Sequence, residues 1–318
     1  MPVVSVVIPT RNRAAYLRQA MESVCAQSFQ DWELLVVNDG STDDTPDVVV
    51  SYRHDPRIRQ IVQEHRGRAA AVNQGVEQGS GRLVAFLDDD DLWMPDKLAK
   101  QVVACEANAQ AGLCYTLAQR MDETGRPIGS GAWPSTVCSG WVLTRLLDDN
   151  FIVNSSVMVR RSCLSRVGRF DTTLPFGSED WHLWLRIARS YPVVLIDTPL
   201  VRYRVHEGNA NFEQLLRSGS AVLEALYRDP RFAGEARVGR GSASANLYLR
   251  AAGAPQRSIR RSTRAAIVAH ALAQSPQAIL TRPMAAALAR LLLPQSLWAG
   301  MAHERQSGHE MLPSSVAR

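Results

Sequence analysis

The first 107 residues alternate short apolar runs, rich in β-branched residues, with longer amphipathic runs, and this alternation narrows the folds open to the chain. Runs of the first kind are typical of buried strands, and runs of the second kind are typical of helices. We predict strands at residues 3–8, 33–38, 58–62 and 82–87, and helices at 14–27, 44–52, 69–78 and 95–107. Strands that take turns with helices form βαβ units. The pattern therefore predicts an α/β fold with a mainly parallel sheet flanked by helices.

Polar clusters follow three of these predicted strands. They are residues 9–13 (PTRNR), residues 38–44 (NDGSTDD) and the four consecutive aspartates at 88–91. In open α/β sheets, ligands bind beyond the carboxyl ends of the strands. Because the three clusters fall at such ends, we expect them to meet at one edge of the sheet and to form a binding site.

The aspartate run is the most unusual of the clusters, because four like charges in a row repel one another. Spaced as they are, Asp88 and Asp90 can direct one carboxylate to a ribose hydroxyl and the other to a divalent cation. Mg²⁺ and Mn²⁺ prefer oxygen ligands and often bind through one or two carboxylates plus substrate phosphates. The alternative is an acidic strand end that caps the next helix. For residues 38–44, the alternative is a turn followed by a helix N-cap.

Composition limits the possible classes of protein. With 318 residues, 46 % of them apolar, the chain can bury a sizeable core. Its net charge of +5 gives mild attraction to anionic partners but does not indicate nucleic acid. The five scattered cysteines predict reduced thiols in a cytoplasmic protein. We expect no signal peptide, because Met1-Pro2 leads directly into the first apolar run without a basic segment or a cleavage site. We also expect no membrane span, since no apolar stretch reaches about 18 residues.

Beyond residue 110 the pattern changes twice. Residues 111–208 mix short strands and loops, with a helix starting at 140–143, a strand at 151–160, a loop at 170–178, a helix at 180–188 and a strand at 193–197. Residues 209–318 are rich in Ala, Leu and Arg and are predicted to be helical, with breaks at 253–255, 275–276 and 294. We predict one catalytic domain over residues 1–208, with halves 1–110 and 111–208, and a helical extension over 209–318.

Four segments in order, residues 5–13, 35–45, 73–75 and 86–93, resemble the family 2 glycosyltransferases, and the resemblance extends over about residues 3–206. These are inverting enzymes with a GT-A fold. The resemblance implies a nucleotide-binding set of Pro9, Thr10, Arg13, Asp39, Arg68, Asp88 and Asp89. In this set Asp39 would contact the base. It also implies that Asp90 and His206 bind a divalent metal, Mn²⁺ or Mg²⁺.

The resemblance continues at residues 177–186, where it implies the catalytic base. Inversion requires a base that takes the proton of the attacking hydroxyl. Asp180 matches that base, Glu179 its neighbour, and Trp181 a side chain that stacks on a sugar. The alternatives are that the two carboxylates cap a helix and interact favourably with its dipole, and that Trp181 belongs to the core. Arg202 and Arg204 are candidates to neutralise the diphosphate, with exposure to solvent as the alternative for each. His65 and His182 are expected to be structural.

The function implied is transfer of a sugar from a nucleotide-diphosphate sugar, expected to be a UDP-sugar, to a hydroxyl of a glycan or lipid-linked acceptor. This activity would serve polysaccharide biosynthesis of the cell envelope, in the cytoplasm or on the inner face of the cytoplasmic membrane. A nucleotidyltransferase and a non-catalytic nucleotide-sugar-binding protein of the same fold are the alternatives. The basic residues 257–264 and the helices around them predict either contact with an anionic membrane surface or packing, on the catalytic domain or in a homodimer.

Overall fold

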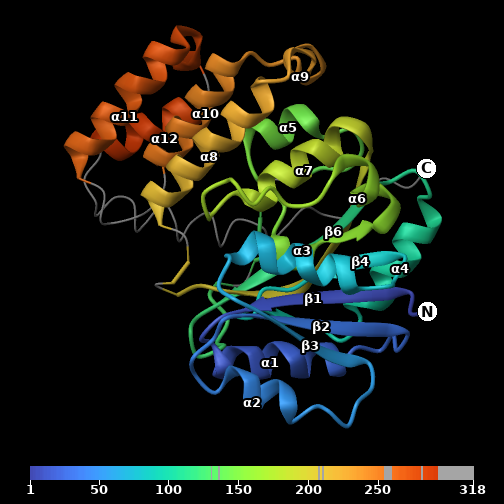
Figure 1. Ribbon diagram of the computed structural model, residues 1–318. Helices are drawn as coiled ribbons and strands as arrows, with labels where there is room; N and C mark the ends of the chain where they lie inside the picture. The colour runs from blue at the N-terminus through green and yellow to red at the C-terminus, as the bar shows by residue number, and fades with distance from the viewer. Residues whose placement is uncertain are drawn as a thin grey trace, which may run out of the picture.

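The computed structural model describes residues 1–129, 131–134, 137–206, 208–209, 211–253, 260–280 and 282–292. Within these residues, eight strands form one mixed sheet in the order β3-β2-β1-β4-β7-β6-β8-β5, with helices on both faces (Figure 1). The pairs β1–β2, β1–β4, β2–β3 and β6–β8 are parallel. The pairs β4–β7, β6–β7 and β5–β8 are antiparallel. The predicted α/β fold, with a mixed, mainly parallel sheet flanked by helices and followed by a helical extension, is confirmed.

The elements have the following bounds. The strands are β1 Val4–Thr10, β2 Trp32–Asp39, β3 Ile58–Gln63, β4 Leu83–Phe86, β5 Leu92–Trp93, β6 Leu113–Met121, β7 Met158–Arg160 and β8 Val193–Arg204. The helices of the sheet domain are α1 Ala14–Cys25, α2 Thr45–Val50, α3 Arg68–Gln78, α4 Lys97–Ala107, α5 Leu143–Asp148, α6 Arg161–Val167 and α7 Glu179–Ser190, with the 3₁₀ turn η1 Asn154–Ser156. The extension contains α8 Phe212–Tyr227, α9 Pro230–Ala236, α10 Arg240–Gly253, α11 Arg261–Gln274, η2 Pro276–Leu280 and α12 Arg282–Leu292.

Alternate side chains of the central strands enter two different apolar cores. In β1, Val7 joins the core under α3, α5 and α7, whereas Val6 and Ile8 join the core under α1, α2 and α4. Such two-sided burial is expected of parallel strands covered by helices on both faces. Figure 1 shows α3 on one side of β1 and β2, and α1 and α2 on the other. The strands are thereby held from both faces, with their carboxyl ends at one edge.

The structure corrects two predicted elements in the second half. The predicted strand at 151–160 is wrong for most of its length, because only Met158–Arg160 is a strand and the 3₁₀ turn η1 precedes it. The carbonyls of Ser155 and Ser156 accept hydrogen bonds from the side chains of Trp93 and Gln101, both at 2.8 Å, instead of pairing with a strand. The strand predicted at 193–197 continues to Arg204. Its register against β6 shifts on both sides of Leu117.

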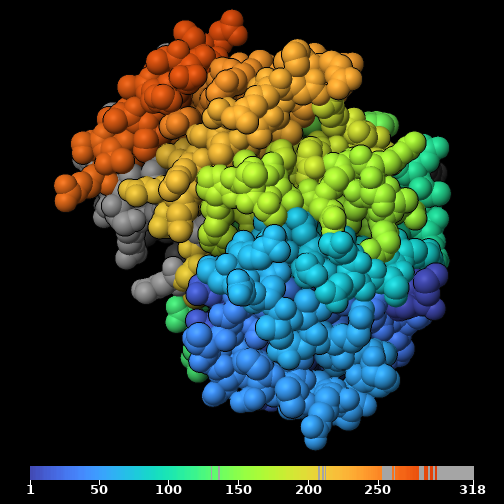
Figure 2. Space-filling view, in the orientation of Figure 1, coloured from blue at the N-terminus to red at the C-terminus, as the bar shows by residue number. Residues whose placement is uncertain are grey.

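The helical extension packs on the sheet domain through α8, α9 and one side of α10. Val222, Leu223 and Leu226 of α8, Phe232 of α9 and Ala243 of α10 belong to the same core as α5 and α7. Other residues of α10 form a separate small core with α11 and α12. Figure 2 shows the extension seated on the sheet domain. Among the described residues, no helix combines the length and apolarity that a bilayer crossing requires. The break at 275–276 is observed. The predicted break at 294, and residues 257–259 of the basic segment, lie outside the described residues.

Candidate active site

A cavity of about 780 Å³ lies at the carboxyl ends of β1, β2 and β4 and extends to α7, α8 and α10. Its volume falls in the range of small-molecule sites. Every predicted site residue except His206 lines it: Pro9, Thr10, Arg13, Asp39, Arg68, Asp88, Asp89, Asp90, Glu179, Asp180 and Trp181. His206 contacts Asp90. The structure thus brings together residues separated by up to about 200 positions in the sequence.

The aspartate run is anchored by its last member. Asp91 is 1 % exposed and accepts hydrogen bonds from the Ser155 hydroxyl at 2.6 Å and from the Arg204 backbone N–H at 2.8 Å. The Arg204 guanidinium donates to the Asp90 carbonyl at 2.7 Å and to the Glu123 carbonyl at 2.8 Å. Burial and the charge of Asp90 raise the pKa of Asp91 well above its usual range. The expectation that Arg204 faces the diphosphate is therefore wrong, because its guanidinium is used on the backbone that carries the run.

Asp89 and Asp90 lie together with Arg13 at one end of the site. The Arg13 guanidinium donates to Asp89 at 3.1 Å and also to Asp90, and His206 Nε2 lies 2.9 Å from Asp90 Oδ2. Burial and the charge of Asp90 raise the pKa of Asp89 to about 7. Burial opposes ionisation of Asp90 as well, but His206 and Arg13 prevail and lower its pKa. Asp90 is thus the member of the pair that stays ionised.

The donor atoms at Asp90 and His206 fit a divalent cation that completes its coordination with substrate. Asp90 Oδ2 and His206 Nε2 lie 2.9 Å apart, close enough for both atoms to bind the same cation. Within the described part of the chain, no group of three or more His, Cys, Asp or Glu side chains is placed to hold a metal. Two protein ligands, with phosphate oxygens and water as the rest, is a common arrangement for Mg²⁺ and Mn²⁺.

Arg68, in the first turn of α3, joins the two halves of the site. Its guanidinium donates to Asp88 Oδ1 at 3.0 Å and to Glu179 Oε1 at 3.1 Å. Asn154 of η1 donates to the same Asp88 oxygen at 3.1 Å. Arg68 therefore fixes the distance between the aspartate run and the start of α7.

The start of α7 presents two carboxylates with different surroundings. Glu179 is 4 % exposed and accepts from the Gly177 N–H at 2.8 Å as well as from Arg68. Asp180 accepts from the Trp181 N–H at 2.6 Å through Oδ1, and its Oδ2 accepts no hydrogen bond from the described residues. Burial, followed by the charge of Glu179, raises the pKa of Asp180 to about 7, although Arg68 opposes the rise. Helix capping accounts for part of this geometry, but it leaves one Asp180 oxygen available to a ligand.

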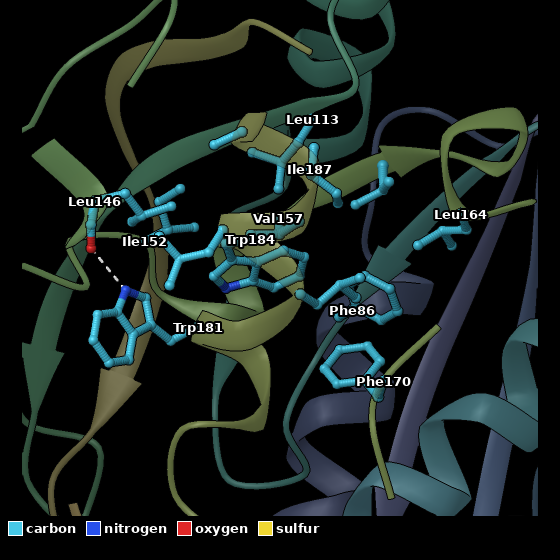
Figure 3. Close-up of a cluster of buried hydrophobic side chains, with 14 of the residues drawn as sticks. Phe86, Leu113, Leu146, Ile152, Val157, Leu164, Phe170, Trp181, Trp184 and Ile187 are labelled. Carbon is cyan, nitrogen blue, oxygen red and sulfur yellow. Dashed lines mark hydrogen bonds between the residues drawn. The ribbon is translucent and has the colours of Figure 1, made fainter. Parts of the chain in front are cut away.

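Trp181 lies mostly in the core. It is 4 % exposed, and its indole N–H donates to the Leu146 carbonyl at 2.7 Å (Figure 3). Trp184 is fully buried, with its ring centroid 5.9 Å from that of Phe86. Core packing therefore accounts for nearly all contacts of Trp181, although the residue also lines the cavity. Its stacking on a sugar stays a prediction.

Asp39 holds the loop that leads into α3. Its two oxygens accept four hydrogen bonds, from the Gln63 side chain at 2.7 Å, His65 Nδ1 at 2.8 Å and the backbone N–H groups of Arg66 and Gly67 at 2.8 and 2.9 Å. Burial opposes ionisation, but these donors lower the pKa of Asp39. Gly67 has a φ of 89°, which a residue with a side chain rarely adopts. The contact of Asp39 with a base stays a prediction.

Several cavity residues escaped the sequence interpretation. His65, expected to be structural, both bonds Asp39 and lines the cavity. Tyr203 lines it too, with its ring 5.0 Å from that of Trp133. From more distant segments come Asn154, Asp148, Asp149, Phe176, Leu215, Leu216, Leu247, Arg250 and Ala251. Tyr203 lies three residues before His206, a predicted site residue, and this proximity was the signal that the sequence offered. The others carry no local pattern that separates a cavity residue from a surface residue.

Comparison with known proteins identifies the family of this chain. The model of the glycosyl transferase family 2 matches residues 5–168, about half of the chain. An uncharacterised glycosyltransferase of Rickettsia felis is 34 % identical over 209 residues, which cover 66 % of this chain and 34 % of that protein. The chain thus spans about a third of the length of this relative.

Two solved structures share the fold. The first is S. aureus TarS 1–349 in complex with UDP-GlcNAc, with a TM-score of 0.63 and 16 % identity, over 94 % of this chain and 92 % of that one. The second is the mannosyltransferase PcManGT from Pyrobaculum calidifontis in complex with GDP-Man and Mn²⁺, with a TM-score of 0.58 and 22 % identity, over 94 % and 88 %. The family match, supported by a shared GT-A fold, shows that this chain belongs to glycosyl transferase family 2.

Proposed function

We propose that this protein transfers a sugar from a nucleotide-diphosphate sugar to an acceptor hydroxyl with inversion at the anomeric carbon. The observation that carries the proposal is the position of Asp180. It is a carboxyl whose pKa is raised to about 7, it has one oxygen that accepts no hydrogen bond from the described residues, and it lies in the same cavity as the aspartate run. A general base works best when its pKa is near the operating pH. Asp180 meets this condition.

The donor is a nucleotide sugar, and we put UDP-sugars first. TarS was solved with UDP-GlcNAc and PcManGT with GDP-Man, so the fold accommodates either nucleotide. In this chain, Pro9, Thr10 and Asp39 would line the nucleotide and Arg13 and Arg68 would meet the phosphates. These two cations now pair with the aspartate run and with Glu179. Donor binding would therefore redistribute existing ion pairs.

The transfer needs one proton acceptor and a stabilised leaving group. Asp180 takes the proton of the acceptor hydroxyl while that oxygen forms a bond to C1 of the sugar and the bond from C1 to the diphosphate oxygen breaks. A divalent cation held by Asp90 and His206 would offset the charge of the diphosphate when bound. Glu179 and Arg68 hold the first turn of α7, so that Asp180 keeps its place.

The acceptor is a hydroxyl of a glycan or of a lipid-linked saccharide, in agreement with a role in polysaccharide synthesis. Nothing in the site favours nucleic acid, since carboxylates line much of the cavity. We propose that the protein acts in the cytoplasm or on the inner face of the membrane.

The direct test is a panel of UDP- and GDP-sugars with and without Mn²⁺. Binding is read from the rise in melting temperature, because a ligand of the native state raises stability with its concentration. Turnover is read from released UDP or GDP, and inversion from the anomeric configuration of the product by NMR. Asp180→Asn should keep the donor-induced shift and lose about 10²-fold or more in turnover. A full set of nucleotide sugars without any shift or release would refute the proposal.

A further inference from the structure

The part of the cavity next to α7 has an apolar wall that comes from the helical extension. Leu215 and Leu216 of α8 and Leu247 of α10 line it, together with Phe176 from the loop before α7. Phe176 is 51 % exposed and Leu215 is 42 % exposed. We call these four residues the apolar wall. All four lie beyond the segment that the family model matches, which ends at residue 168.

The apolar wall is fixed next to the proposed base. Ser178, at the start of α7, is bonded to Ser218 of α8 through their hydroxyls at 2.7 Å. Phe176 lies four residues before Asp180 in the same loop and helix start. Phe176, Asp180 and Leu215 thus line the same cavity, and the start of α7 is tied to α8 beside them.

Polar groups at the end of α5 line the same cavity as the apolar wall. Arg250 of α10 pairs with Asp149 at 2.7 Å, and Asn246 donates to Asp148 at 2.8 Å. Asp148, Asp149 and Arg250 line the cavity. These contacts hold α10 against α5, and the two carboxylates present acceptors of the kind that sugar hydroxyls bind. This side of the cavity thus combines a few sugar-binding groups with a larger apolar surface.

We infer that the acceptor is a saccharide with an apolar aglycone, such as an alkyl or isoprenoid chain. The inference rests on the proposed function. The sugar hydroxyl faces Asp180, its neighbours meet Asp148 and Asp149, and the apolar chain covers the apolar wall. Exposed apolar side chains gain stability when an apolar group removes them from water, whereas a purely polar glycan would leave them uncovered. The reaction is the one given above: the hydroxyl proton goes to Asp180, the bond from C1 to the acceptor oxygen forms, and the nucleotide diphosphate leaves.

The test compares methyl, butyl and octyl glycosides of glucose, galactose and N-acetylglucosamine as acceptors, below their critical micelle concentrations. A fully buried methylene changes affinity about fourfold, and a half-covered one about twofold. Seven added methylenes should therefore lower the acceptor KM by about 100-fold from methyl to octyl. Leu215→Ser and Phe176→Ser should each compress this ratio at least about threefold. Val103→Ser is the matched control, because Val103 is 67 % exposed on α4 outside the cavity, and it should leave the ratio unchanged.

Failure of this inference differs from failure of the proposed function. A donor that binds and is turned over, with an acceptor KM independent of chain length, overturns the inference alone. Absence of donor binding and of nucleotide release overturns both. A second copy of the chain is another occupant for the apolar wall. If light scattering shows a dimer that Leu215→Ser dissociates while the chain-length effect stays the same in the variant, the inference is also overturned.

Discussion

Replacing Glu179 with Gln should move the pH profile of sugar transfer to lower pH. Asp180 works as a base only when it is ionised, so kcat/KM for the acceptor should rise with pH through its pKa and level off above it. Burial sets the raised pKa of Asp180, and the charge of Glu179 is the next largest cause. Removing that charge stabilises the ionised form of Asp180, so the base becomes active at lower pH.

The size of the effect follows from a pKa of about 7. At pH 6 about a tenth of Asp180 is ionised and at pH 8 about nine tenths, so kcat/KM of the unaltered protein should rise about tenfold between them. A like charge on a neighbouring residue is worth on the order of one pKa unit. In Glu179→Gln the rise over the same interval should therefore fall to about twofold.

Arg68→Gln supplies the opposite control. Arg68 lowers the pKa of Asp180, so its loss should move the midpoint to higher pH while it also reduces overall activity through the lost contact with Asp88. The assay is the initial rate of nucleotide release at saturating donor and limiting acceptor, from pH 5.5 to 9. A profile of the unaltered protein that is flat between pH 6 and 8, or a midpoint that rises in Glu179→Gln, would refute Asp180 as the base.

Three further changes test the rest of the site. Asp90→Ala should abolish the part of the donor-induced melting shift that depends on Mn²⁺. His206→Ala should lower the affinity for Mn²⁺ about tenfold, as measured by titration. An Asp90→Ala protein that keeps its full Mn²⁺ dependence contradicts the metal assignment. Asp39→Ala leaves two backbone N–H groups and two side chains without their acceptor, so urea unfolding should show a loss of roughly 1–3 kcal/mol, and donor Kd should rise; an unchanged Kd argues against the base contact. Arg204→Met should lower the free energy of unfolding by about 3 kcal/mol or more, because the buried carbonyls that its guanidinium binds lose their donor. A loss below about 1 kcal/mol would show that these carbonyls find other partners.

The first 110 residues were predictable because their signals are local. The spacing of apolar residues predicts β1, β2 and α3, and the order of these elements determines where the strand ends meet. The polar clusters at 9–13 and 88–91 therefore come together without further information. Even there, the sequence did not reveal that Asp91 points into the interior, since its partners Ser155 and Arg204 lie 64 and 113 positions away.

Residues 111–208 and the helical extension were less predictable because long-range contacts decide their structure. The run at 151–160 has the composition of a strand, but the side chains of Trp93 and Gln101 bind its carbonyls and leave a 3₁₀ turn. Among the first 110 residues, β5 escaped prediction because its two residues are too few for any periodic signal. The helical period of the extension predicted helices, but it did not show that Leu215 and Arg250 reach the cavity.

The anchoring of Asp91 separates two tasks within four residues. Its carboxylate, held by Ser155 and Arg204, fixes the backbone, while Asp88, Asp89 and Asp90 face the cavity. Changes in the three cavity-facing aspartates therefore alter charge without removing the support of the loop. The same scaffold can be retuned toward another phosphate-bearing donor by exchanging those side chains and keeping the fourth. For protein engineers, Asp91 is the position to leave untouched.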